Sequence, residues 1–221
     1  MKNHSRLIGA FFLFGFLSYG GGFALVSSVL GAPDFLPALV ARHSTVAVGA
    51  FLMLLNTVAD IGKGVLFFPI LECHGKRTAL AYLSLMIVEV VLLDVGVVFL
   101  LMTIPLGQHA GEGWAQGVAS LLTQANAMAY QVAEAALGVG GVFLCLVLRR
   151  ARLVPRFLAD WGLVGYAIFV AGAVAEILGI HVGVALSIPG GLFEIAIGVW
   201  LLSKSIRRDA DADMTFQPAA A

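Results

Sequence analysis

The chain has 221 residues, of which 60% are hydrophobic and 12% are charged, and its formal net charge is zero. Soluble domains carry roughly 25% charged residues, so this composition excludes an ordinary soluble domain and indicates an integral membrane protein. The mean hydropathy of +0.98 points the same way. Two cysteines, Cys73 and Cys145, give neither a disulfide framework nor a paired metal-ligand spacing, and we expect both to be reduced thiols.

Six apolar stretches reach the length of about 20 residues that a helix needs to cross a bilayer. In chain order they are residues 7–31, 44–71, 78–104, 126–148, 156–179 and 184–204. The loops between them are short, so consecutive spans should be antiparallel neighbours. We therefore predict an all-α fold, a polytopic membrane helix bundle with six transmembrane helices over residues 1–206. A disordered cytoplasmic tail should follow over residues 207–221.

Three local features modify this prediction. Residues 110–125 are less apolar, and we expect a surface-lying helix that leads into the fourth span. Pro189, followed by Gly190 and Gly191, predicts a kink in the sixth span directly before Glu194. Pro69 predicts a second kink near the inner end of the second span.

Lys and Arg residues gather at alternate ends of the spans. One set of ends carries Lys2, Arg6, Lys76, Arg77, Arg149, Arg150, Arg152, Arg156, Lys204, Arg207 and Arg208, whereas the opposite loops carry only Arg42. Basic residues remain on the cytoplasmic side, so we expect both termini to be cytoplasmic in a multi-pass protein of the cell membrane. The basic ends should contact anionic lipid headgroups, and we expect no nucleic-acid partner.

The predicted spans also contain ionisable residues far from water. Asp60, Glu89 and Glu194 fall near mid-membrane, with Glu134 slightly to the outer side and Lys63 slightly to the inner side. Inserting these groups one by one against lipid would cost on the order of 12–18 kcal/mol in total. We therefore expect them to face one another or water, or to be protonated.

Helical spacing supports an inward direction for these groups. Asn56, Asp60 and Lys63 share one face of the second span, and small residues accompany Glu134 and Glu194 on their faces. Counting equal steps from the turn between the second and third spans places Asp60 level with Glu89. A Lys side chain can bridge about 4.5 Å of helical rise, so we predict that Lys63 is shared between Asp60 and Glu89. The open alternatives are a structural ion pair and a working site for a proton or a ligand.

The resulting candidate site comprises Asn56, Asp60, Lys63, Glu89, Glu134 and Glu194. No predicted span contains a histidine, which argues against di-iron and His-ligated haem sites, and we expect no cofactor. His43, His109 and His181 lie in the predicted outer loops without a fixed spacing, so we expect no metal site. The Gly-rich stretch "SYGGGFA" lies inside the first span, and we interpret it as close helix packing rather than as a phosphate-binding loop.

Three stretches resemble a known family. They are "TALAYLSLMIVEV" in the third span, "RRARLVPRFLADWGLVG" between the fourth and fifth spans, and "IPGGLFEIAIGVWLLSKS" in the sixth. The chain resembles, over nearly its whole length, the bacterial membrane proteins grouped as domain of unknown function 4386. The resemblance implies a multi-span helical membrane protein and no established activity. The family often carries an Arg three residues before the Glu of the third span, where this chain has Met86, and we hypothesise that Lys63 replaces that cation.

Three functions remain open at this stage. The first is the binding or carriage of a small polar or amphiphilic ligand, or of a proton, through the central carboxylates. The second is a non-catalytic structural or assembly role in which the charges only hold helices together. The third is an intramembrane enzyme that acts on a lipid with two carboxylates as acid and base, which lacks a nucleophile or cofactor motif and is less favoured. The sequence predicts no oligomeric state.

Overall fold

The structure, a computed structural model, describes residues 2–32, 34–204 and 206. Within these residues it is all-helical, and six helices are long and apolar enough to span a membrane. The helices are α1 (Lys2–Leu30), α2 (Leu36–Glu72), α3 (Lys76–Thr103), α4 (Gly113–Arg150), α5 (Arg156–Ile177) and α6 (Ile188–Ser203). Short 3₁₀ helices, η1 (Ile104–His109) and η2 (Gly183–Ser187), follow α3 and precede α6. The prediction of a six-helix membrane bundle is therefore confirmed, and the predicted tail lies outside the described residues.

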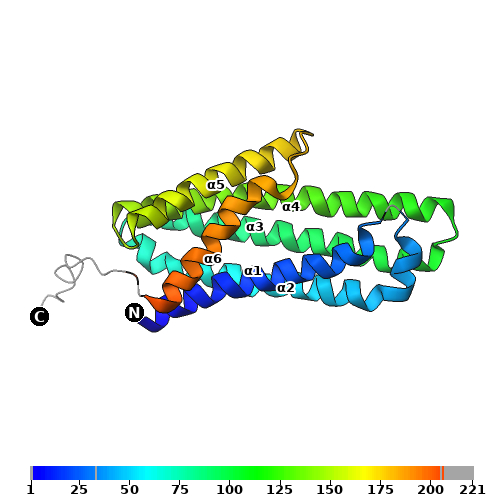
Figure 1. The fold of residues 1–221 in the computed structure, drawn as a ribbon, viewed down its shortest axis with the longest axis horizontal. Helices are drawn as coiled ribbons and strands as arrows, with labels where there is room; N and C mark the ends of the chain where they lie inside the picture. The colour runs from blue at the N-terminus through cyan, green and yellow to red at the C-terminus, as the bar shows by residue number, and fades with distance from the viewer. Residues whose placement is uncertain (1, 33, 205, 207–221) are drawn as a thin grey trace, which may run out of the picture.

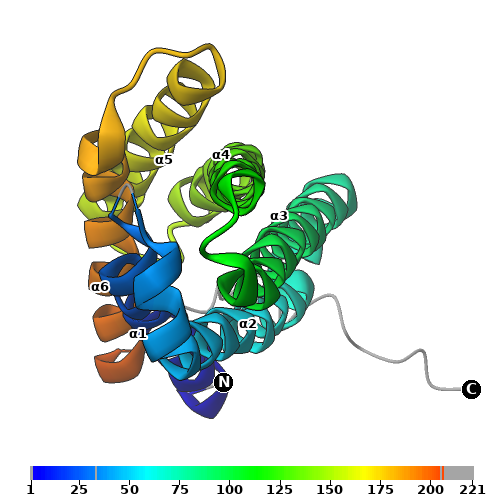
Figure 2. The same ribbon diagram turned by 90° about the vertical axis from the view of Figure 1, so that its right-hand side faces the viewer.

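The helices form a ring in which each packs on the next and α6 returns to α1 (Figures 1 and 2). Because the loops are short, successive helices run in opposite directions, and the start of α1 lies at the same end as the finish of α6 (Figure 1). The backbone N–H of Ile206 donates to the Ser5 hydroxyl at 3.2 Å. This contact joins the two ends of the described chain.

Two apolar clusters occupy the two ends of the bundle. The first contains Phe12, Phe67, Tyr82, Tyr166 and Phe193, with ring-to-ring contacts such as Phe67–Tyr82 at 6.1 Å between centroids. The second is built from smaller side chains and includes Val26, Leu39, Met53, Val97 and Ala119. Along α1 to α4, the residues between the two clusters include the polar ones, Ser18, Asn56, Asp60, Lys63, Glu89 and Glu134. The polar side chains thus form a layer between the two apolar clusters.

The fourth helix is longer than predicted and includes most of the segment expected to lie on the surface. α4 is continuous from Gly113, and Ala115 and Ala119 in its first turns are fully buried in the second apolar cluster. The helix predicted to lie on the surface over residues 110–125 and to lead into the fourth span is instead the start of α4 itself, because its small side chains Ala115 and Ala119 pack against the bundle. α2 likewise begins at Leu36 rather than at residue 44, so that His43 lies within it.

Of the two prolines predicted to kink a helix, one begins a helix instead and the other lies inside α2. Pro189 is the second residue of α6, a position where its missing N–H breaks no helical hydrogen bond, so it begins a helix instead of bending one. Helix α2 continues through Pro69, and its non-helical backbone angles are at Arg42. The Arg42 guanidinium donates to the carbonyl and the hydroxyl of Ser28 at 3.2 Å, and so ties α2 to the end of α1.

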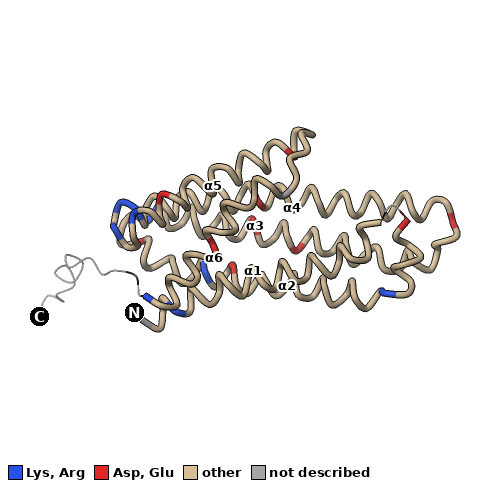
Figure 3. The backbone as a smooth tube through the Cα atoms, viewed as in Figure 1, with Lys and Arg blue, Asp and Glu red and all other residues tan. Residues whose placement is uncertain are grey.

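The two ends of the bundle differ in charge. Lys and Arg gather at the end that holds the α2–α3 and α4–α5 turns (Figure 3). We call this the basic end and the opposite one the outer end. At the outer end, His109 Nδ1 lies 2.7 Å from Glu112 Oε1, and the Trp114 indole N–H donates to Glu112 Oε2 at 2.5 Å. These contacts hold the pKa of Glu112 below its usual value, and the contact with His109 has the largest effect.

Candidate functional site

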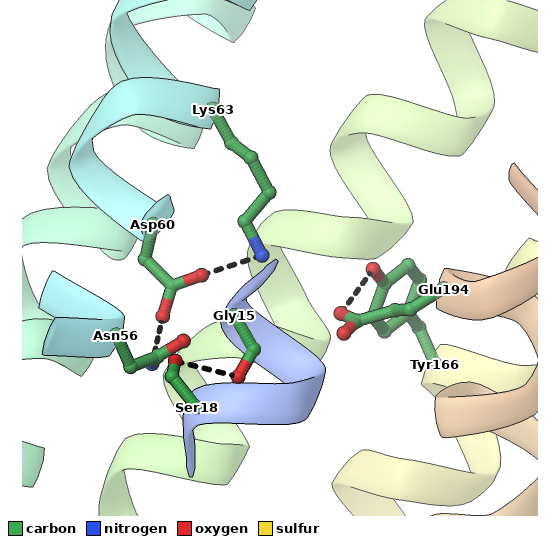
Figure 4. Close-up of polar contacts among 7 residues, drawn as sticks. All are labelled: Gly15, Ser18, Asn56, Asp60, Lys63, Tyr166 and Glu194. Atoms are coloured by element: carbon green, nitrogen blue, oxygen red, sulfur yellow. Dashed lines mark hydrogen bonds and ion pairs between the residues drawn. The ribbon is translucent and has the colours of Figure 1, made fainter. Parts of the chain in front are cut away.

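One face of α2 supplies the centre of the polar layer. Residues 56, 60 and 63 are spaced by four and three, which puts their side chains above one another on a helix. The Asn56 amide donates to the Asp60 carboxylate, and the Lys63 ammonium forms an ion pair with the other Asp60 oxygen at 2.5 Å (Figure 4). The ion pair is almost fully buried, with side-chain exposures of 4% for Lys63 and 3% for Asp60. The Lys63 ammonium also lies 4.6 Å from the centre of the Phe12 ring.

Gly15 lets α1 pack closely against the face of α2 that carries Asn56, Asp60 and Lys63. A Cβ at Gly15 would lie 2.7 Å from Asn56 Oδ1 and 3.3 Å from the Cβ of Ala59. Any larger residue would therefore push α1 away from the polar face of α2. The Ser18 hydroxyl, one turn later, donates to the Gly15 carbonyl at 3.2 Å and is satisfied within its own helix (Figure 4).

Glu89 on α3 and Glu134 on α4 are buried without complete hydrogen bonding. Their exposures are 2% and 6%, and one carboxylate oxygen of each, Oε2, has no hydrogen-bond partner. Glu134 has the Tyr130 hydroxyl beside it, one turn earlier on α4. Unpartnered buried polar atoms are costly, and those found in a native fold require a specific explanation.

The predicted sharing of Lys63 between two acids is only half right. Lys63 pairs with Asp60, and the structure gives no ion pair or hydrogen bond between Lys63 and Glu89, both of which it describes. Asp60 precedes Lys63 by three residues on the same helix, so the ammonium reaches its partner without crossing to α3.

Glu194 approaches the same space from α6. It accepts a hydrogen bond from the Tyr166 hydroxyl of α5 at 2.9 Å, and Figure 4 shows Glu194 and Lys63 directed toward the same region from opposite sides. Glu194 is half-buried, unlike Glu89 and Glu134. Its hydrogen bond to Tyr166 also links the last two helices of the ring.

A cavity of about 480 Å³ connects these residues. Its walls come from all six helices, and it extends from Lys63 to Glu176, Gly183 and Ser187 near the outer end. All six residues of the sequence-derived candidate site line it: Asn56, Asp60, Lys63, Glu89, Glu134 and Glu194. This volume falls within the range of about 300–1,000 Å³ that is common for sites of small organic ligands.

Several lining residues were not predicted. Tyr19 of α1 and Tyr130 of α4 stack across the cavity with ring centroids 5.9 Å apart, and Gly20, Asn126 and Gln131 lie on its walls. Tyr130 shares a helix face with Glu134, so spacing could have included it. The stretch "SYGGGFA" does not show whether Tyr19 lines a cavity or packs against a helix. The answer depends on the distance between α1 and α4, which the local sequence does not determine.

The remaining intramembrane acids have separate partners. Asp94 of α3 accepts a hydrogen bond from the Thr57 hydroxyl of α2 at 2.8 Å and is absent from the cavity wall. Glu176 accepts hydrogen bonds of 2.7 Å from the backbone N–H groups of Val182 and Gly183, and His181 Nδ1 lies 3.2 Å from its other oxygen. Among the residues that the structure describes, no group of three or more His, Cys, Asp or Glu side chains could hold a metal ion.

The fold and the site define a six-helix integral membrane protein with a polar cavity inside its ring of helices. Residues 7–205 match the model of the family described as Domain of unknown function (DUF4386), and the chain belongs to that family. No curated protein and no solved structure matched the chain.

Proposed function

We propose that this protein binds a small ligand in the intramembrane cavity, with Glu89 and Glu134 as the groups that recognise it. The observation that carries the proposal is that Glu89 and Glu134 line the cavity and each has one buried carboxylate oxygen without a hydrogen-bond partner. An unpartnered buried acceptor costs about 1–3 kcal/mol, and more when it is charged. A ligand that donates hydrogen bonds, or a proton taken up with it, removes that cost.

The second candidate function is a structural role, and other acids support it. Asp94 links α3 to α2 through Thr57, and Glu194 links α6 to α5 through Tyr166. Glu89 and Glu134 do not fit this role as well, since each leaves an oxygen without a protein partner. The two functions predict different thermal stabilities for the variants Glu89→Gln and Glu134→Gln. A structural role predicts lower thermal stability in both variants, whereas the ligand proposal predicts stability no lower than that of the wild-type protein.

Two adjacent glycines provide a direct test of the cavity. A Cβ at Gly20 or at Gly21 would meet nothing within 4 Å, but only Gly20 lines the cavity. The variants Gly20→Phe and Gly21→Phe therefore change helix propensity and size equally, while only the first fills the site. We expect native mass spectrometry of protein transferred from its membrane into lipid nanodiscs to detect a bound small molecule on the wild-type protein and on Gly21→Phe. Gly20→Phe should lose it.

If the wild-type protein, Gly20→Phe and Gly21→Phe all carry the same amount of bound small molecule, the cavity is not the binding site. A wild-type protein that carries no adduct, and whose thermal stability falls in both glutamine variants, would favour the structural role.

A further inference from the structure

The charges on the cavity wall are unbalanced. Among the described lining residues, Lys63 is the one Lys or Arg, and Asp60 already holds it at 2.5 Å. Glu89 and Glu134 line the same cavity from the neighbouring helices α3 and α4. The two lining carboxylates Glu89 and Glu134 thus each keep an acceptor oxygen that no donor of the described residues reaches. A group that carries several N–H donors and a positive charge complements these oxygens, because hydrogen bonds from a cation to a carboxylate are the strong ones.

Much of the remaining cavity wall is aromatic and apolar, although Asn126 and Gln131 also line it. The stacked pair Tyr19–Tyr130 lies beside Glu134, and Phe16, Phe23 and Phe169 also line the cavity. Aromatic faces attract cations within about 6 Å of the ring centroid, and they also bury hydrocarbon. A ligand with an ammonium group and an apolar body would satisfy both kinds of wall.

The cavity is also open toward the lipid. Phe16 and Phe23 line it and are 45% and 51% exposed. Gly20 between them and Ala127 on α4 are exposed as well. Helix α5 ends at Ile177 and α6 begins only at Ile188, and α4 runs on toward the outer end beyond this hairpin (Figure 1). These positions belong to membrane-spanning helices, and the opening therefore faces acyl chains.

We propose that the ligand is an amphiphilic organic cation, a protonated amine on an apolar body, which enters from the bilayer between α1 and α4. Its ammonium group binds between Glu89 and Glu134, and its apolar part lies against the Tyr19–Tyr130 pair. This inference rests on the proposed function, because it names the class of ligand that the same cavity takes.

Three probes of ten carbon atoms each test the charge of the ligand: decylamine, decanol and decanoate. Binding is measured by calorimetric titration of the protein in lipid nanodiscs, and titration of the Gly20→Phe protein in equal discs corrects for partition into lipid. We expect decylamine to bind at least about tenfold more tightly than either other probe, because hydrogen bonds to charged groups contribute more than neutral ones. This comparison uses the wild-type protein and depends on no variant that might fail to fold.

Variants then locate the ammonium. Glu89→Gln and Glu134→Gln should each weaken decylamine binding about tenfold or more and leave decanol binding unchanged. Asp94→Asn is the matched control, since Asp94 lies on the same helix as Glu89 but outside the cavity wall. It should leave decylamine binding at the wild-type level.

The outcomes separate the two proposals. If decanol or decanoate binds as tightly as decylamine, and Gly20→Phe abolishes that binding, the cavity is a ligand site and the cationic class is wrong. If no probe shows binding that depends on Gly20, the inference is overturned, and the adduct experiment decides the proposed function independently. Equal loss of decylamine binding in Asp94→Asn and Glu89→Gln would also overturn the inference, because the effect would then be a general one of intramembrane acids.

Discussion

At the residue scale, the intramembrane charges fall into two groups that differ in their partners. Lys63 and Asp60 neutralise each other within one helix, and Asn56 holds the second Asp60 oxygen. Glu89 and Glu134 lie in equally dry surroundings with an oxygen each unsatisfied. Because breaking a buried ion pair leaves an uncompensated charge, the first group should dominate stability and the second should dominate recognition.

The buried pair can be tested by removing its cation. Lys63→Met should lower the free energy of unfolding by about 3–5 kcal/mol, because it leaves the Asp60 carboxylate buried without a counter-charge. The double variant Asp60→Asn with Lys63→Met should be more stable than Lys63→Met, as measured by denaturant unfolding in detergent micelles. Arg149→Met is the control. It breaks the half-exposed Arg149–Asp160 ion pair and should cost no more than about 1 kcal/mol.

The hypothesis that Lys63 replaces a cation at position 86 gives a second residue-scale prediction. Met86 is buried, and a Cβ at Gly64, next to Lys63, would lie 3.5 Å from the Met86 Cβ, so positions 63 and 86 are at the same level. We expect Lys63→Met combined with Met86→Arg to be better folded than Lys63→Met alone. Heating followed by size-exclusion chromatography measures the folded fraction. A double variant less folded than the single one would show that the hypothesis is wrong.

At the element scale, glycines determine how closely α1 and α2 approach. A Cβ at Gly22 would lie 2.4 Å from the Gly49 carbonyl oxygen, and a Cβ at Gly49 would lie 2.7 Å from the Gly22 carbonyl oxygen. The backbones of the two helices are therefore in direct contact, as small residues permit in membrane bundles. This contact, together with Gly15 further along α1, keeps α1 against the face of α2 that carries Asp60.

This close approach predicts different effects for two neighbouring glycines. Gly22→Ala should destabilise the protein by about 1–3 kcal/mol, because the added methyl group would overlap backbone atoms that cannot rotate away. Gly21→Ala adds its methyl group where nothing lies within 4 Å, and better helix propensity should make it neutral or slightly stabilising. Thermal unfolding of both variants in the same detergent measures the difference. Equal stability would mean that α1 and α2 do not touch at this point.

At the scale of the whole molecule, the ring of helices encloses a polar layer between two apolar clusters. The basic residues gather at one end of this ring (Figure 3). We propose that this end faces the cytoplasm, since the positive-inside rule places Lys and Arg there, and that the protein lies in the cell membrane. The cavity would then open toward the bilayer in its outer half.

Cysteine labelling tests the orientation. Cys73 is exposed in the turn between α2 and α3 at the basic end, whereas Cys145 is buried. A membrane-impermeant maleimide should leave Cys73 unmodified in intact cells and modify it once the membrane is disrupted. Gly111→Cys, in the open loop before α4, is the positive control and should be modified in intact cells. Labelling of Cys73 in intact cells, with none at position 111, would reverse the proposed orientation.

The sequence by itself determined the number of helices, because each span must be apolar over a length fixed by the bilayer. It also predicted six of the polar residues that line the cavity, since a charged side chain on a membrane helix is costly unless it faces inward. Spacing along one helix even placed Asp60 beside Lys63 correctly. These features depend on local sequence and on the surrounding solvent alone.

Only the tertiary structure decided which of these groups have partners. Glu89 belongs to a different helix from Lys63, and their contact depends on the rotation and separation of two helices, which spacing along each chain segment does not fix. The same reason applies to the Tyr19–Tyr130 stack, the length of α4 and the opening between α1 and α4. Each follows from side chains packing across the ring, where distances of a few ångströms separate a filled contact from a cavity.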